Sequence, residues 1–181
     1  MNGRLLKSGL AALALAMLGG SLMAHDDEDR DHGRNRDGKF VVRAELVGLQ
    51  EVPAVSTPAR GTFRAVVDTV ANTITFRLTY DGLEGTVTQS HVHFGQKNVN
   101  GGISFFLCSN LPNPPPGTQA CPIPPAEVVG VITPDNVIGP TGQGIPVASF
   151  AEIAAAIDDG FAYANVHSTL EQGGEIRGQL H

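Results

Sequence analysis

A hairpin of two β-branched runs is the strongest structural signal in this chain. Residues 62–67 and 73–80 are strand-like, and the polar segment 68–72 between them is typical of a turn. In the second run, large apolar residues occupy every other position: Ile74, Phe76, Leu78 and Tyr80. Because successive side chains of a strand point to opposite faces, this alternation predicts one buried face and one wet face.

Short strands of this kind continue to the end of the chain. Further strands are predicted at residues 40–47, 90–94, 103–107, 128–133, 161–166 and 175–180. One helix is predicted at 151–157, where Ser149 and Glu152 have capping-box spacing and Gly160 is a natural stop. This pattern indicates an all-β fold: an antiparallel β-sandwich, immunoglobulin-like or superoxide-dismutase-like Greek key, with one short helix near the C-terminus.

Residues 1–24 have the pattern of a cleavable signal peptide. Arg4 and Lys7 precede an uncharged apolar run, and Ala24 provides a small residue at the cleavage site. The leader has no cysteine for a lipid anchor, and no later apolar stretch approaches the roughly 20 residues of a spanning helix. We therefore expect a secreted or periplasmic protein that does not insert into the membrane after signal cleavage.

The distribution of charged residues along the chain indicates a tail that precedes the folded domain. Residues 25–39 hold six acidic and four basic side chains and no large apolar one, which predicts a disordered tail before a single domain at 40–181. Loss of the leader leaves ten basic and eighteen acidic side chains, a net charge of −8. This balance disfavours nucleic acid and anionic membranes as partners. For His25 and His32 in the tail, we favour solvated disorder over loose metal chelation.

Cys108 and Cys121 are the only cysteines. In an exported protein, a single pair separated by 13 residues favours a disulfide, here one that closes a proline-rich loop. A metal-thiolate pair is the alternative, but no CxxC spacing supports it. We therefore predict the disulfide.

Two short motifs place three histidines. His91 and His93 lie in Ser-His-Val-His-Phe-Gly, and His167 lies in Asn-Val-His-Ser. Residues two apart on a strand share a face, so His91 and His93 point together while Val92 and Phe94 turn to the core. We therefore expect the imidazoles on an exposed outer face, available to a metal, a ligand or a partner.

The last strand pair adds a second polar face. Its apolar positions alternate with polar ones that share the opposite side: Asn165, His167, Glu175, Arg177 and Gln179. Glu175 could accept the second ring N–H of His167, as an outer-shell partner of a metal ligand does. For Glu175 and Arg177 we favour a cross-strand salt bridge over a ligand contact. Gln50 and Glu51, before Pro53, could reach a ligand, but we favour their interpretation as turn residues.

Six stretches together resemble one known family. They are Gly48–Val55, Ala59–Phe63, Leu78–Leu83, Ser90–Gly95, Gly160–Ser168 and Gly174–Leu180. In this order they resemble the CHRD domain, found in chordin and in exported bacterial proteins, over nearly all of residues 40–181. The resemblance implies an extracytoplasmic β-sandwich with a largely unassigned role, and chordin suggests protein binding. The stretch between Ile103 and Ser149 is longer and richer in proline than the family minimum, so no site is carried over from it.

A second similarity is shorter. His91-Val-His-Phe-Gly95, which follows a hairpin and a Gly-Leu turn, is similar to the copper-ligand strand of copper–zinc superoxide dismutases. Gln96 stands where that family has an Asp after the glycine. The additional histidines and the aspartate that hold zinc in that family have no counterparts in this chain. A shared sandwich architecture accounts for most of this likeness.

Two functions remain open from the sequence. The first is a non-enzymatic extracytoplasmic binding or structural module that recognises an extracellular protein or small ligand. Its recognition residues would be His91, His93, Asn165, His167, Glu175 and Arg177. The second is a mononuclear copper or zinc protein with a superoxide-dismutase-like redox site, in which His91, His93 and His167 bind the ion and leave an open position. Without a metal, the same imidazoles would hydrogen-bond to loop backbone and Glu175. No nucleophile motif supports covalent catalysis.

Overall fold

The computed structural model describes residues 37–181. The predicted signal peptide at 1–24 and the tail histidines His25 and His32 lie outside these residues. The predicted tail extended to Lys39, but Lys39 already begins the first strand, where it faces Asp68 across the ladder. Within the part of the chain that is described, no helix is long and apolar enough to cross a membrane.

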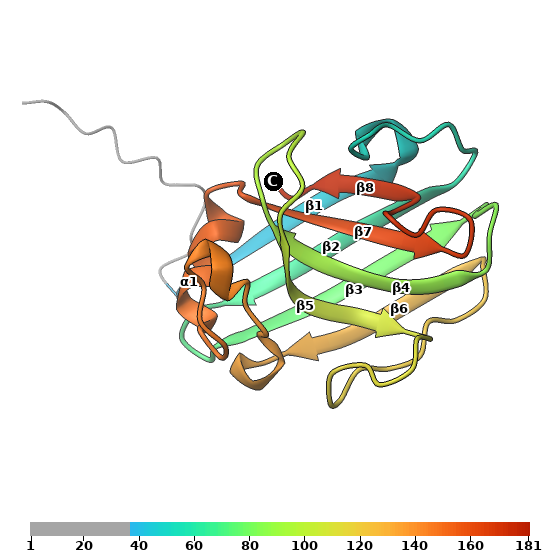
Figure 1. Cartoon of the computed structure of the whole chain (residues 1–181). Coiled ribbons are helices and arrows are strands. Elements are labelled where there is room, and N and C mark those ends of the chain that lie inside the picture. The colour runs from blue at the N-terminus through green and yellow to red at the C-terminus, as the bar shows by residue number, and fades with distance from the viewer. Residues whose placement is uncertain (1–36) are drawn as a thin grey trace, which may run out of the picture. The chain divides into compact units, whose positions relative to one another are not determined.

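Eight strands and one α-helix build the domain (Figure 1). The strands are β1 (Lys39–Val47), β2 (Arg60–Asp68), β3 (Thr73–Asp81), β4 (Val87–Phe94), β5 (Gly102–Ser109), β6 (Ala126–Ile132), β7 (Ala162–Ser168) and β8 (Ile176–Gln179). The helix is α1 (Phe150–Asp158), which lies at one end of the strands (Figure 1). Every predicted strand is present, and the hairpin turn between β2 and β3 forms as expected.

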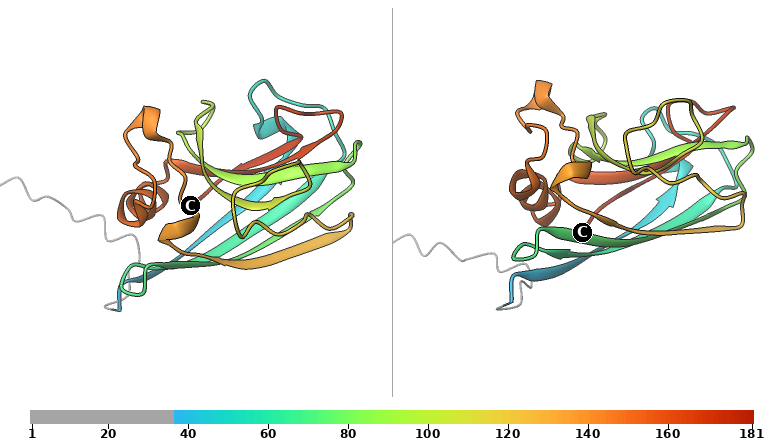
Figure 2. Two further views of the ribbon diagram at one scale, coloured as in Figure 1. Left: turned by 60° about the horizontal axis from the view of Figure 1, so that its bottom comes forward. Right: turned by 90° about the horizontal axis from the view of Figure 1, so that it is seen from below.

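The strands form one antiparallel sheet that folds into two layers. Their order is β5-β4-β7-β8-β1-β2-β3-β6. The first four strands make a front layer and the last four a back layer, and β8 joins β1 through the pair Val47 and Arg177 (Figure 2). The sheet is thus a nearly closed, barrel-like sandwich, which confirms the predicted all-β sandwich.

Alternating side chains fill the space between the layers. In β1, β2 and β3 every second residue is buried, as the sequence pattern predicts. Residues of both layers meet in one core that includes Leu46, Phe63, Leu78, Val92 and Ile176. Val92 is fully buried and Phe94 packs against this core, so the predicted orientation of β4 is confirmed.

The remaining opening between β5 and β6 is closed by the proline-rich connection rather than by a strand ladder. Cys108 in β5 and Cys121 in the connection form the predicted disulfide. Gln119, from the same connection, donates from Nε2 to the carbonyl of Leu107 in β5 and to that of Val129 in β6. These contacts cover backbone groups that an open sheet edge would otherwise expose.

The helix forms where the sequence predicts it, but its capping differs. Ser149 is the N-cap residue, yet its side chain makes no capping hydrogen bond, so the predicted capping box with Glu152 is wrong. Burial of Phe150, Ile153 and Ile157 against the core supports the helix instead. Gly160 follows the helix with φ of +75°, a conformation that glycine adopts without strain.

Candidate metal centre

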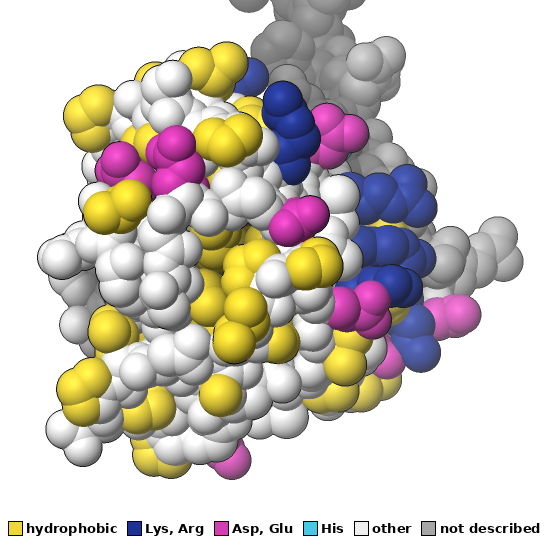
Figure 3. Space-filling model, turned by 90° about the vertical axis from the view of Figure 1, so that its right-hand side faces the viewer, with side chains coloured by type: hydrophobic (Ala, Val, Ile, Leu, Met, Phe, Trp, Pro, Cys, Tyr) yellow, Lys and Arg dark blue, Asp and Glu magenta, His cyan; other side chains and the backbone are white. Residues whose placement is uncertain are grey.

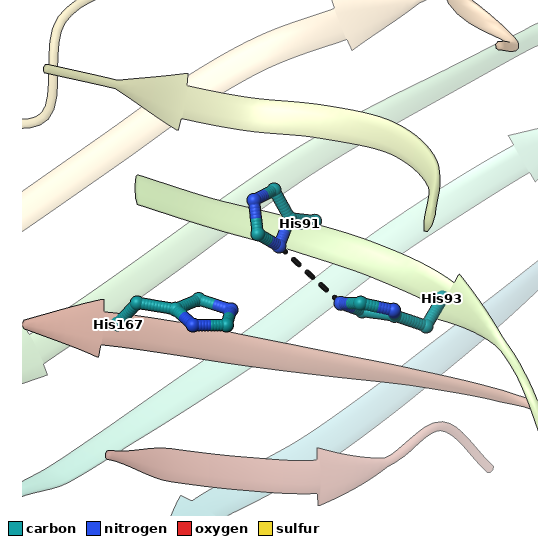
Figure 4. A group of neighbouring side chains, drawn as sticks. All are labelled: His91, His93 and His167. Carbon is teal, nitrogen blue, oxygen red and sulfur yellow. Dashed lines mark hydrogen bonds between the residues drawn. The ribbon is translucent and has the colours of Figure 1, made fainter. Parts of the chain in front are cut away.

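Two neighbouring strands bring three imidazoles together. His91 and His93 lie on β4 and His167 lies on β7, and the ladder between these strands pairs His91 with Asn165 and Gln89 with His167. One nitrogen of each imidazole lies within 4.8 Å of the others. Figure 4 shows the three rings converging from the two strands. We call His91, His93 and His167 the imidazole cluster.

The cluster is buried, which corrects the expectation of an exposed outer face. The exposed fractions are 1% for His91, 8% for His93 and 5% for His167. The rings do lie on the side of the front layer that faces away from the core, as the strand alternation predicts. Connections at 95–101 and 169–174 fold over that side, and the first of these crosses the front layer near β8 (Figure 1).

These connections also orient two of the rings. His93 donates from Nδ1 to the carbonyl of Gly101 at 2.9 Å, and His167 donates from Nδ1 to that of Gln172 at 2.9 Å. A neutral imidazole has only one ring proton, so Nε2 of each ring is left with a free lone pair. Metal-bound histidines commonly have this arrangement, with the second ring nitrogen fixed by a carbonyl.

The spacing within the cluster resembles that of a coordination sphere. His91 Nδ1 lies 3.3 Å from His93 Nε2, and Asn165 Oδ1 lies 3.2 Å from the same nitrogen. Ligands held about 2.0–2.1 Å from a tetrahedral ion lie about 3.3–3.4 Å from one another. All three donor nitrogens lie within 4.8 Å of one another, so small movements of the rings would bring them to the spacing of ligands around one ion.

Several buried lone pairs in the site lack a proton donor. His91 Nε2 and His167 Nε2 have no hydrogen-bond partner among the described residues. Both ring nitrogens of His93 face carbonyl oxygens, those of Gly101 and Asn165, but a neutral ring can donate to only one of them. A cation held between the rings would take the lone pairs of His93 Nε2 and His167 Nε2, and His91 would bind it through Nδ1, with its ring proton on Nε2.

Burial keeps the imidazoles neutral. Desolvation, followed by repulsion from His167 and His93, lowers the pKa of His91 to about 2. Desolvation also lowers the pKa of His93 to about 4, against the opposing effect of its Gly101 hydrogen bond. The pKa of His167 is lowered for the same reason. At neutral pH the site therefore presents unprotonated nitrogen donors, the form that binds copper or zinc.

Arg177 anchors the connection that covers the cluster. It is 1% exposed and donates to Asn100 Oδ1 and to the carbonyls of Gln96 and Val99. Its guanidinium lies 3.4 Å from the centre of the Tyr163 ring, and that ring stacks on His93 with the planes 3° apart. The predicted salt bridge between Arg177 and Glu175 is wrong, because no such ion pair occurs within residues 37–181.

Glu175 lies apart from the cluster. Its Oε1 accepts hydrogen bonds from the Thr57 hydroxyl and the Glu84 backbone N–H, both at 2.8 Å. The predicted bond from His167 to Glu175 is therefore wrong, since His167 Nδ1 uses the Gln172 carbonyl instead. The positive φ of Gly174 turns the backbone just before Glu175, which follows no regular strand geometry.

Glu51 and Tyr163 belong to the surroundings of the cluster, although the sequence analysis interpreted Glu51 as a turn residue and did not name Tyr163. Burial raises the pKa of Glu51 to about 7, and its carboxyl group lies beside the Asn165 amide. The alternation of side chains along β7 could have identified Tyr163, because residues 163, 165 and 167 share one face of the strand. No local signal marked Glu51, which reaches the site from the loop after β1.

Among the predicted site residues, the structure thus brings His91, His93, Asn165 and His167 together, with Arg177 alongside and Glu175 apart. A family model described as the CHRD domain matches residues 42–180 of the chain, from β1 to the end of the sheet. No curated protein and no solved structure matches the chain.

Proposed function

This chain belongs to the CHRD-domain family, and on that premise we propose that it is a non-enzymatic extracytoplasmic module that binds one copper or zinc ion. His91, His93 and His167 are the proposed ligands. The family assignment and the disulfide support a role outside the cytoplasm, where such bonds persist. Burial of the cluster argues against direct recognition of a macromolecule by these side chains.

One observation carries the metal proposal: three neutral imidazoles converge in a buried site in which two ring nitrogens have no hydrogen-bond partner. His91 Nε2 and His167 Nε2 lack partners, and a buried unsatisfied polar atom costs about 1–3 kcal/mol. A bound ion would remove this cost at His167 Nε2, which holds a lone pair because Nδ1 of that ring carries the proton. Asn165 Oδ1 provides a fourth donor at ligand spacing from His93.

The chemistry of the donors favours copper or zinc. Imidazole suits zinc and copper, whereas calcium and magnesium require several oxygen ligands. Gly101 and Gln172 hold two of the rings by their Nδ1–H groups, which fixes the nitrogen that faces the ion. The ion would link β4 to β7 from the outer side of the front layer.

The test is metal content of the full chain after exposure to Cu²⁺ or Zn²⁺ and dialysis. The tail histidines should first be removed as His25→Ala and His32→Ala, so that any metal found is not held by the tail. We expect one ion per chain in this background, and loss of that ion in His93→Ala and in His167→Gln. The matched control is His181→Ala, which removes an exposed histidine far from the cluster in sequence and should keep the ion.

X-ray absorption spectroscopy of the metal-loaded protein then distinguishes coordination by imidazole from non-specific binding of the ion. Nitrogen scattering at about 2.0–2.1 Å from the ion is expected for imidazole ligands. Melting temperatures of the metal-free variants establish that each still folds. The proposal would be contradicted if the protein with His25→Ala and His32→Ala bound no metal. It would also be contradicted if His93→Ala and His181→Ala kept the same amount of metal.

A further inference from the structure

Three arginines form a row across the outer face of the back layer. Arg43 on β1 pairs directly with Arg64 on β2, and Arg64 pairs directly with Arg77 on β3. All three side chains are exposed. Neighbouring strands lie roughly 4.8 Å apart, so the row repeats positive charge at that spacing. We call these residues the arginine row.

The fold does not neutralise this row. Like charges directly opposite each other on neighbouring strands destabilise a sheet. Arg77 forms an ion pair with Glu127 of β6, but Arg43 and Arg64 form none within the described residues. Two arginines therefore lie directly opposite each other on neighbouring strands, and neither forms an ion pair with this part of the chain.

A polar groove lies over the row. It has a volume of about 810 Å³, and its lining includes the cations Arg43, Arg64 and Lys97. Gln50, Gln179 and Thr62 add uncharged groups that both donate and accept hydrogen bonds, and Glu45 is the one acidic residue of the lining. The groove thus combines positive charge with the amides and hydroxyl that suit a polyhydroxylated ligand.

Cations are gathered on this side of the molecule. The described residues contain seven Lys and Arg side chains, of which Arg177 is buried. Five of the others lie on β1, β2 and β3, and Lys97 lines the groove. Figure 3, which views the molecule from the right-hand side of Figure 1, shows dark blue Lys and Arg side chains concentrated along one edge of this surface. This concentration contrasts with the net charge of −6 of the whole chain.

From these features we propose that the groove and the arginine row bind an acidic polysaccharide. Guanidinium groups pair with carboxylate or sulfate in a planar, two-pronged geometry, and a polymer offers such groups repeatedly. The aromatic residues of β1, β2 and β3 are all buried, so the face lacks the stacking platforms that single-stranded nucleic acids use. This site is separate from the imidazole cluster and does not depend on metal.

The test measures binding of the full chain to polygalacturonate, with neutral dextran as the reference polymer. We expect binding to polygalacturonate alone, weakened by salt because charge attraction is screened. The double variant Arg43→Ala with Arg64→Ala should bind at least ten-fold more weakly, whereas Arg43→Lys with Arg64→Lys, which keeps the charge but not the planar fork, should lose less affinity. The melting temperature should stay unchanged, since both positions are exposed.

A matched control separates a local site from net charge. Ala151→Glu with Ala155→Glu changes the net charge by the same amount at exposed positions of α1 and should leave binding within two-fold. Equal weakening in this control would overturn the proposal, as would binding no stronger than that of neutral dextran. Binding to anionic lipid vesicles or single-stranded DNA without binding to polygalacturonate would also overturn it.

Discussion

The two layers of this sandwich differ most on their outer faces. On the back layer, the outward residues Arg43, Arg64 and Arg77 are exposed. On the front layer, the equivalent outward residues of β7 and β8, among them His167 and Arg177, are buried. Both faces are polar in sequence, and both follow the same two-residue alternation.

Connections between strands account for the difference. The front layer is covered by segments 95–101 and 169–174, whose carbonyls accept hydrogen bonds from His93, His167 and Arg177. No described segment provides such contacts to Arg43 or Arg64. Polarity along a strand therefore identifies an outward face without revealing whether that face is wet, because buried polar groups are tolerated once they are hydrogen-bonded.

The strongest test of this comparison removes one arginine from each face. Arg177→Ala should lower the free energy of unfolding by about 4 kcal/mol, because the 95–101 connection loses the buried guanidinium that donates to three of its acceptors and the Tyr163 ring loses its neighbour. Arg64→Ala should change it by less than about 0.5 kcal/mol. Urea unfolding of both variants measures the two changes in the free energy of unfolding. Equal changes would mean that the covered outer face of the front layer contributes no more to stability than the exposed outer face of the back layer.

Acid should destabilise the covered face selectively. The lowered pKa values of His91, His93 and His167 mean that the unfolded chain binds more protons below about pH 6.5, so stability falls as the pH drops from there towards 4. The raised pKa of Glu51 acts in the opposite direction between about pH 7 and 4.5, but one carboxyl group offsets only part of the effect. We expect a net loss of about 2 kcal/mol from pH 7 to 5.

Urea unfolding of the metal-free protein at both pH values measures this loss. His167→Gln should reduce the pH dependence, since one buried imidazole no longer has to become charged. Arg64→Ala serves as the control on the exposed face and should leave the pH dependence unchanged. Stability that rises on acidification would show that the imidazoles are not held neutral.

The smallest expected difference concerns single hydroxyl groups. Tyr163→Phe removes the contacts of the phenol with the Gly101 backbone and should cost about 1 kcal/mol. Thr79→Val breaks the 2.7 Å hydrogen bond between Thr62 and Thr79 on the exposed face, but valine suits a strand and water can solvate the remaining hydroxyl. The effect of Thr79→Val on the melting temperature should be negligible. A comparable loss of stability in Tyr163→Phe and Thr79→Val would contradict the difference between the covered and the exposed face.

Much of the fold could be predicted because its signals are local. Alternation in β3 identified its inward residues, and the cysteine pair identified the disulfide. The capping of α1 was wrong although the helix itself was right, because packing of Phe150 and Ile153 replaces the expected Ser149 bond. Local sequence patterns thus predicted the positions of the strands and the helix more accurately than the contacts at the ends of the helix.

The candidate site could be predicted only in part. Alternation correctly placed His91 and His93 on one side of β4, but it could not show that β7 lies beside β4. The role expected for Glu175 failed because the chain turns at Gly174, and its carboxylate meets Thr57 and Glu84 instead of His167. Glu51 was missed because its approach to Asn165 depends on a loop that is distant in sequence.

The order of residues along the chain was enough to determine the strands, the side of β4 that carries the imidazoles, and the cysteine pairing. Each of these depends on neighbours in sequence, on side-chain period or on residue type. Only the tertiary structure decided that His167 joins His91 and His93 and that loops seal all three from water. The reason is that strand pairing and loop covering are contacts between distant segments, whose energies no local pattern contains.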